Sequence, residues 1–509
     1  MQGLQYLFEG LFGLLTFTSL FNVAWATVLG IIVGMLPGLT ATMGVALLTT
    51  LTYKLPPEQA ILILLCMYVG AIYGGSRSAI LLNIPGTPAN AATSLDGFPL
   101  ARQGRAGYAM AIATTSSAIG TFIGVVCLAV IAPLLANVAL DFGSYEFFWL
   151  ALFGIVISGQ LTAQGTPIKG IIAGILGLMV AMIGMEGIHA HMRFTFGIAE
   201  LNGGIGLIPA MVGAFGFAEV LTVMADKKAV LVSNKVDRIL PRLGDLWRTK
   251  WTAIRSGIVG TFVGVIPGVG EDIGAWASYA LARRTSRERD QFGNGSIDGL
   301  TAAETGNSAV VPGALIPALT LAVPGSAPAA VLIAALFIHG VRPGPMIMIE
   351  QPTFVYEVVA MLLLATIAIT VFGLLMARPL LFVLKIPRER LMPVVFVLCV
   401  IGPYAITQRM FDVVIMLVFG VIGFLMRRMN YPMAPLVLGI ILGDLLDKNL
   451  RRGLTLSDGD ISPFITRPIS VTFAILIVLT ILASIPFVRR SIARLFARDK
   501  SGRTAAEPN

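Results

Sequence analysis

The sequence reads Gly30-Ile31-Ile32-Val33-Gly34-Met35-Leu36-Pro37-Gly38 near its start and Gly260-Thr261-Phe262-Val263-Gly264-Val265-Ile266-Pro267-Gly268 about 230 residues further along. In both copies two glycines lead into a Pro-Gly step within an apolar stretch. Proline removes a helix hydrogen bond and glycine tolerates positive φ, so this step interrupts a helix dependably. Both copies therefore predict one helix that stops and a second that starts.

A further break follows each copy in the same order. The first reads Asn83-Ile84-Pro85-Gly86-Thr87-Pro88-Ala89, and its looser counterpart reads Ala322-Val323-Pro324-Gly325-Ser326-Ala327-Pro328. Both lie inside apolar stretches, which is typical of re-entrant hairpin tips. Because the order is preserved, the chain is predicted to be a duplication. We assign residues 1–225 to the first transmembrane repeat, 226–255 to a basic linker and 256–447 to the second repeat.

Composition places these repeats in a membrane. Of the 509 residues 56% are hydrophobic and 12% are charged, against about 25% charged in ordinary soluble proteins. Apolar stretches of roughly twenty residues recur, and each is long enough to cross a ~30 Å hydrocarbon core. The prediction is an all-α polytopic protein of the bacterial inner membrane, embedded in a lipid bilayer. The net charge of +9 does not indicate nucleic acid, because the basic residues lie in short loops.

Lys and Arg concentrate on the cytoplasmic side of a membrane protein, so they indicate its orientation. The linker 226–255 and the tail 489–509 are predicted to be cytoplasmic. The loops at Asp141 and at Lys385 occupy equivalent places in the two repeats yet fall on opposite sides, as inverted repeats require. The loop with Lys448 falls outside, against the rule. The segment 448–488 has no counterpart and predicts a loop and an extra C-terminal transmembrane helix.

The residues that follow the first breaks differ chemically. A half-helix that begins inside a membrane protein points free N–H groups and its positive dipole end into the interior, which favours an anion. Thr40 and Thr42 follow the first break, whereas Glu271 and Asp272 follow the second. These acids either decorate a helix start at the membrane surface or, at depth, handle a cation or a proton.

Polar residues also gather around the second breaks, and Arg77 is a lone cation among apolar neighbours. Its side chain either extends to the membrane interface or binds a carboxylate in a cavity. The three cysteines lack CxxC spacing and the three histidines are too few and too badly spaced, so no metal site is predicted.

At these residues the chain resembles the large membrane subunit of the tripartite tricarboxylate transporters, the TctA-type family. The resemblance spans about residues 20–445 and rests on Gly34–Gly38, Tyr73–Ser76, Asn83–Pro88, Leu95-Asp96-Gly97, Gly264–Gly268, Pro324–Ser326 and His339-Gly340. It implies symport of a tricarboxylate or dicarboxylate with sodium or protons, without a tightly bound cofactor. It also implies two partners, a small multi-span TctB-type subunit and a periplasmic TctC-type binding protein that hands over the substrate.

The resemblance further implies that the Pro-Gly elements and neighbouring polar residues form the transport site. The predicted substrate-binding residues are Pro37, Gly38, Thr40, Thr42, Ser76, Arg77, Asn83, Pro85, Gly86, Thr87, Asn90, Asn307, Ser308, Pro324, Gly325 and Ser326. The predicted coupling-ion residues are Gly268, Gly270, Glu271, Asp272 and Glu304. Two positions depart from the family pattern: Arg77 stands where an uncharged residue is usual, and Ser308 where a second asparagine is frequent.

Two other classes of protein compete with this interpretation. A passive anion channel can also be lined by broken helices. An intramembrane aspartyl protease needs two acids on facing spans, and Gly270-Glu271-Asp272 and Gly443-Asp444 do not reproduce its GxGD element. The prediction is therefore a transporter and not an enzyme.

Overall fold

The computed structural model describes residues 2–484 except 37, 163–165, 189, 226–242, 378 and 380–389. Pro37, most of the predicted linker and the predicted tail 489–509 lie outside the described residues. The described part is helical apart from one antiparallel pair of short strands, β1 (Gly184–Met185) and β2 (Met192–Arg193).

The helices up to residue 225 are α1 (Gln2–Gly13), α2 (Phe17–Met35), α3 (Ala41–Thr52), α4 (Pro57–Leu82), α5 (Asn90–Arg102), α6 (Ala106–Ala139), α7 (Ser144–Thr162), α8 (Pro167–Ala181), η1 (Ala199–Gly203), α9 (Leu207–Met211), the π-helical η2 (Val212–Phe217) and α10 (Ala218–Ala225). Those from residue 243 are α11 (Leu243–Val265), α12 (Gly270–Thr285), η3 (Arg289–Gln291), α13 (Ile297–Leu321), α14 (Ala327–Ile338), α15 (Ile347–Glu350), α16 (Pro352–Leu375), α18 (Met392–Thr407), α19 (Met410–Arg428), α20 (Met433–Leu456), α21 (Ser462–Thr466) and α22 (Pro468–Ser484).

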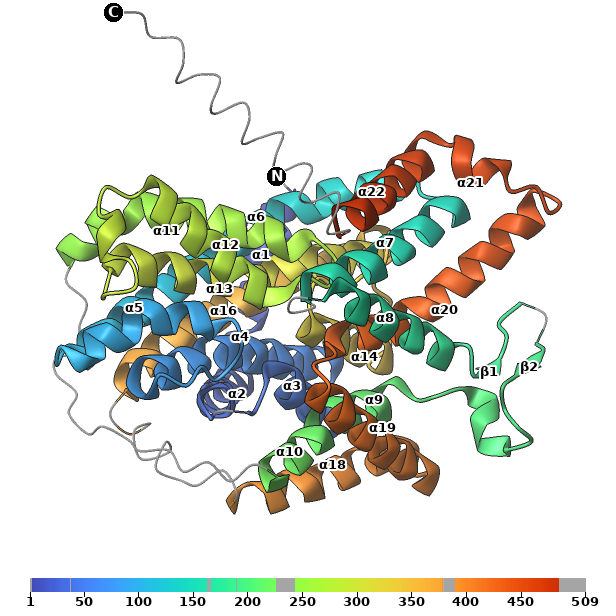
Figure 1. Ribbon diagram of the computed structural model, residues 1–509, viewed down its shortest axis with the longest axis horizontal. Coiled ribbons are helices and arrows are strands. Elements are labelled where there is room, and N and C mark those ends of the chain that lie inside the picture. The colour runs from blue at the N-terminus through green and yellow to red at the C-terminus, as the bar shows by residue number, and fades with distance from the viewer. Residues whose placement is uncertain are drawn as a thin grey trace, which may run out of the picture.

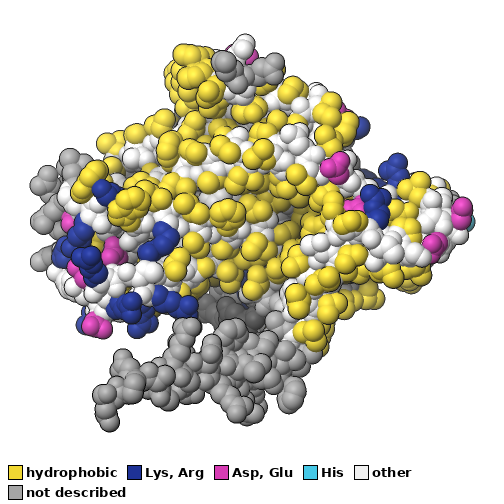
Figure 2. Space-filling view, turned by 90° about the horizontal axis from the view of Figure 1, so that it is seen from above, with side chains coloured by type: hydrophobic (Ala, Val, Ile, Leu, Met, Phe, Trp, Pro, Cys, Tyr) yellow, Lys and Arg dark blue, Asp and Glu magenta, His cyan; other side chains and the backbone are white. Residues whose placement is uncertain are grey.

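Seven of the described helical segments are long and apolar enough to cross a membrane: Phe17–Met35, Pro57–Leu82, Ala106–Ala139, Ser144–Thr162, Leu207–Ala225, Pro352–Leu375 and Met410–Arg428. Apolar side chains cover much of the face shown in Figure 2, and Lys and Arg gather near its two ends. This distribution suits a protein whose flank faces lipid. It confirms the all-α membrane class predicted from composition.

The helices are arranged around α4 and α13 (Figure 1). Helix α4 packs against α2 and α5, and α13 packs against α6, α11 and α12. In Figure 1 the helices α11 and α12 lie on one side of this centre and α2 and α3 on the other. Helices α18 and α19 form one edge with α10, while α20, α21 and the strand pair extend at one end.

The first pair of breaks occurs where the sequence predicts it. Helix α2 ends at Met35, and α3 begins after Thr40, whose Oγ1 accepts a hydrogen bond from the Met43 N–H at 3.2 Å. Helix α11 ends at Val265 and α12 begins at Gly270. The positive φ angles of Gly38 (97°) and Gly268 (71°) are the kind that glycine adopts most easily.

The second pair of breaks repeats one backbone geometry. Helix α4 is followed by Asn83 at φ 55°, whose N–H bonds to the Ser78 carbonyl, and α13 is followed by Ala322 at φ 56°, whose N–H bonds to the Pro317 carbonyl. A left-handed residue at this place closes a helix end. We call residues 83–89 the first tip and residues 322–326 the second tip.

Each tip then turns back along the helix it has left. The Gly86 N–H bonds to the Gly75 carbonyl and the Gly325 N–H to the Ala314 carbonyl, both at 3.4 Å. A Cβ added at Gly86 would collide with the Gly34 carbonyl, and one added at Gly325 with the Gly264 carbonyl. Only glycine therefore fits where each tip meets the broken helix before it.

Candidate functional site

The two tips and the helix starts beside them converge on the centre of the bundle. Two hydrogen bonds of 3.1 Å join the break between α11 and α12 to the second tip. They run from the Gly268 N–H to the Pro324 carbonyl and from the Gly270 N–H to the Gly325 carbonyl. The hydroxyl of Tyr68, halfway along α4, contacts the hydroxyl of Ser326 at 2.6 Å. The candidate site therefore contains elements from both parts of the chain.

Glu304 lies at the heart of this region and is fully buried. Its Oε2 accepts hydrogen bonds from Ser76 Oγ at 2.6 Å and from Ser117 Oγ at 2.8 Å, and Thr93 donates to its Oε1. Among the described residues, no Lys or Arg forms an ion pair with this carboxylate. A buried carboxylate surrounded by hydroxyl oxygens, with no protein cation, suits a proton or a small hard cation.

The first tip contributes to the same cluster. Asn90, at the start of α5, donates from Nδ2 to Ser76 Oγ at 3.3 Å, and Thr87 Oγ1 donates to Asn90 Oδ1 at 2.6 Å. Predicted substrate-binding residues Ser76, Thr87 and Asn90 are thus brought together with Glu304, a predicted coupling-ion residue.

Glu271 forms a second acidic centre. Its side chain accepts a hydrogen bond from the Tyr68 hydroxyl, and only 7% of the residue is exposed. The surface alternative for this acid is therefore wrong. The next carboxylate, that of Asp272, is less buried and interacts with the backbone N–H of Ala89 at the start of α5.

Arg77 is buried, with 1% of its surface exposed. Its Nη2 donates to Tyr73 Oη and to the Gly373 carbonyl, and its Nη1 lies 3.7 Å from Met110 Sδ. The alternative of a side chain at the membrane interface is therefore wrong. Gly373 belongs to the last turn of α16, whose negative dipole end stabilises a cation.

The other predicted residues take various places. Thr40 caps its own helix, and Thr42 is buried in α3. The Gly268 carbonyl accepts a hydrogen bond from Ser158 of α7 at 3.2 Å. Asn307 and Ser308 are buried on α13, and neither amide atom of Asn307 nor the hydroxyl of Ser308 has a partner among the described residues.

Three residues of the site were missed from the sequence: Tyr68, Thr93 and Ser117. Tyr68 is a single polar group in an apolar stretch, so it carried no signal, and nothing distinguished Thr93 from its polar neighbours Ser94 and Asp96. Ser117 belongs to the run Thr114-Thr115-Ser116-Ser117 inside an apolar span, and this run was a usable signal. Such residues cost free energy in a membrane unless they find partners.

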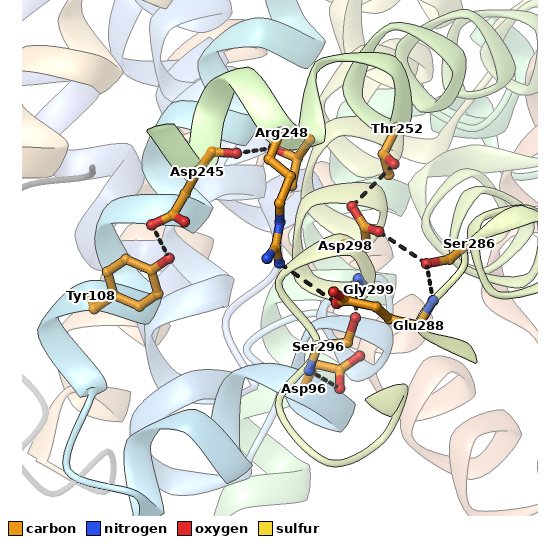
Figure 3. Close-up of polar contacts among 11 residues, drawn as sticks. Asp96, Tyr108, Asp245, Arg248, Thr252, Ser286, Glu288, Ser296, Asp298 and Gly299 are labelled. Atoms are coloured by element: carbon orange, nitrogen blue, oxygen red, sulfur yellow. Dashed lines mark hydrogen bonds and ion pairs between the residues drawn. The ribbon is translucent and has the colours of Figure 1, made fainter. Parts of the chain in front are cut away.

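A separate polar region lies around Asp96 of α5 and the loop between α12 and α13 (Figure 3). Asp96 of α5 accepts three backbone hydrogen bonds at its Oδ1, from Gly293 at 2.8 Å, Gly295 at 3.0 Å and Ser296 at 2.8 Å. Its Oδ2 accepts a fourth from the Tyr279 hydroxyl at 2.9 Å. The carboxylate of the Leu95-Asp96-Gly97 motif thus binds the loop between α12 and α13.

Candidate membrane spans packed around interrupted helices with buried acids are typical of multi-pass membrane transport proteins. The chain belongs to the tripartite tricarboxylate transporter TctA family, whose model matches residues 20–438. It is therefore a TctA-type membrane subunit.

The chain is also similar to two proteins from Agrobacterium vitis. The chain is 35% identical over 489 residues to the "uncharacterized 52.8 kDa protein in TAR-I ttuC' 3'region", covering 94% of this chain and 96% of the relative. It is 32% identical over 241 residues to the "uncharacterized protein in TAR-II ttuC' 3'region", covering 47% of this chain and all of the relative. No solved structure matches the chain.

Proposed function

We propose that this protein is the transport subunit of an ion-driven carboxylate importer. It takes a tricarboxylate or dicarboxylate from a periplasmic TctC-type binding protein, works with a small TctB-type membrane subunit and uses a sodium or proton gradient. The observation that carries the proposal is Glu304, a buried carboxylate held by hydroxyls from α4, α5 and α6 and without an ion-pair partner among the described residues.

We further propose that residues 1–225 and 256–447 are inverted repeats whose tips are re-entrant hairpins. The matching hydrogen bonds at Gly86 and Gly325 support the repeat. Ser76 contacts Glu304, and Tyr68 contacts Ser326 of the second tip, which the Gly325 hydrogen bond brings back beside Ala314 of α13. Residue numbers therefore fall along α4 where they rise along α13, and this supports inversion. The equivalent helices α4 and α13 thus run in opposite directions, as in transporters that alternate access about a central site.

In this proposal Glu304 and Glu271 bind the coupling cation, and the tips with their polar neighbours bind the substrate. Cation binding beside the substrate lowers the cost of bringing an anion close to these acids. A passive anion channel fits less well, because anion pores are lined by basic rather than acidic side chains.

The test is uptake by vesicles that contain this protein and its small membrane partner, with binding protein supplied outside. Uphill accumulation of a carboxylate should collapse when the sodium and proton gradients are dissipated. Purely downhill flux would contradict ion-driven transport. Uptake that needs no binding protein would contradict the tripartite assignment.

A further inference from the structure

The start of α5 lies beside Asn307 of α13, whose side-chain amide has no hydrogen-bond partner among the described residues. The two helices run in opposite directions, because Thr93 contacts Glu304 and a Cβ at Gly97 would lie 3.6 Å from Leu300. Continuing this register by one turn places Asn307 beside the first residues of α5, Ala89 and Asn90. Helix α12 also runs against α13, since a Cβ at Gly299 would contact Tyr279 at 3.0 Å and one at Gly274 would contact the Gly306 carbonyl at 3.2 Å. Asn307 therefore lies where the starts of α5 and α12 meet.

Asn307 is 0% exposed, and neither its Nδ2 nor its Oδ1 has a hydrogen-bond partner among the described residues. The neighbouring Ser308 is 3% exposed, and its Oγ also lacks a partner there. A buried polar group that is left unpaired destabilises the folded protein. Two unpaired polar side chains beside the start of α5 therefore indicate that a ligand forms hydrogen bonds with them.

The helix start beside Asn307 favours an anion. Helix α5 has 13 residues, and its first N–H groups carry the positive end of the helix dipole. In this structure the Asp272 carboxylate, which comes from the other part of the chain, interacts with the Ala89 N–H at that start. A carboxylate of the protein thus lies near this helix start.

We propose that a carboxylate group of the substrate binds at the start of α5, opposite Asn307, and that Asp272 holds this position in the empty transporter. The donors are the Ala89 N–H, the Asn307 amide and the Ser308 hydroxyl. The inference rests on the proposed transport function. It gives Asp272 a different role from that of coupling-ion ligand, which the sequence predicted. Asp272 competes with substrate.

This competition links substrate to the coupling cation. A substrate carboxylate that displaces Asp272 leaves a free carboxylate next to Glu271, which raises the affinity of the site for a cation. By linkage, a cation bound there raises the affinity for substrate by the same factor. Substrate and cation therefore bind together.

The experiment measures initial uptake in vesicles for wild type, Asp272→Asn and Asn307→Ala, with the probe that wild type accumulates among citrate, tartrate and malate. Asn307→Ala should raise the half-saturating carboxylate concentration about tenfold, the value of one hydrogen bond to a charged group. Asp272→Asn should lower it by about threefold or more, because a neutral amide competes less well. The matched controls are the exposed residues Asp290→Asn and Asn294→Ala, which should behave as wild type.

Folding is checked in the same samples. Removing an unpaired buried amide should leave the melting temperature of Asn307→Ala unchanged or higher, and Ser308→Ala serves as a second, milder variant in the same direction. Reduced uptake in Asp272→Asn at all carboxylate concentrations, with cation dependence lost, would make Asp272 an ion ligand and overturn the inference. A half-saturating concentration within about twofold of wild type in both Asn307→Ala and Ser308→Ala would also overturn it. If wild type accumulates none of the three probes, the proposed function itself fails, and the inference falls with it.

Discussion

Ser76 of α4 donates a 2.6 Å hydrogen bond to Glu304 of α13 across 228 residues of sequence. This bond joins the two parts of the chain through the only carboxylate that the structure places among hydroxyls of α4, α5 and α6 within the described residues.

Replacing Glu304 by Gln should abolish gradient-driven uptake. Glutamine keeps the shape but cannot carry the negative charge that attracts a cation, so we expect initial rates to fall by at least about a hundredfold. Membrane insertion and melting temperature should not fall, because a buried charge has been removed. Glu350→Gln, an exposed residue of α15, is the control. If Glu304→Gln takes up substrate in a gradient-dependent way at the wild-type rate, Glu304 does not bind the coupling ion.

Valine at Gly86 or Gly325 should stop transport. An added Cβ at these positions meets the carbonyl of Gly34 or Gly264, and a β-branched side chain demands still more space. We expect uptake below about a tenth of wild type with the protein still in the membrane. Gly244→Val, where nothing lies within 4 Å of the added Cβ, is the matched control. Normal uptake by Gly86→Val and Gly325→Val would mean that the tips neither move nor contact substrate.

Arg77 should matter for stability rather than for substrate affinity. Replacing it by Ala removes its hydrogen bonds to Tyr73 and to the last turn of α16 and leaves a cavity, at a cost of about 2–4 kcal/mol. The melting temperature should fall while the half-saturating carboxylate concentration of the folded protein stays unchanged. The exposed Arg289→Ala is the control. A large rise in the half-saturating carboxylate concentration at an unchanged melting temperature would instead support the prediction that Arg77 binds substrate.

The strand pair β1–β2 should detach from α20 in acid. Burial raises the pKa of Asp447, but its contacts with Arg193 at 2.9 Å and Arg451 at 3.0 Å outweigh this and hold the pKa below the ordinary 3.8. Because the folded pKa is depressed, the stabilisation is complete above the ordinary value and is lost as pH falls through the folded value. Hydrogen exchange at residues 184–193 should therefore accelerate below about pH 4. In Asp447→Asn the exchange should be fast already at neutral pH; the same acid-induced step in that variant would assign the transition to another group.

The sequence predicted the parts of the fold that local chemistry determines. Proline and glycine act on the backbone of their own segment. A single sequence was therefore enough to predict the breaks at Gly38, Gly86, Gly268 and Gly325. Glu304 was also predicted as a site residue, because it stands in a group of polar residues near the second break. Pro37, which was predicted with them, lies outside the described residues.

The partners of those residues could not be predicted, because they depend on packing between distant helices. The partner of Arg77 is a backbone carbonyl of Gly373, which has no sequence signature at all. Ser117 donates a hydrogen bond to Glu304 only because α6 packs along α13, where Gly120 lets the two helices approach closely. For the same reason the contact of Asp272 with Ala89 had no counterpart in the sequence pattern.

The hydrogen bonds of Asp96 have a consequence for how the protein can be assembled. One side chain from residues 1–225 is bound by three backbone N–H groups and a tyrosine from residues 256–447. We therefore expect these hydrogen bonds to help hold the two parts of the chain together even without a covalent connection. Two polypeptides ending at 225 and starting at 243, made together in one cell, should copurify, and Asp96→Ala should weaken that pairing.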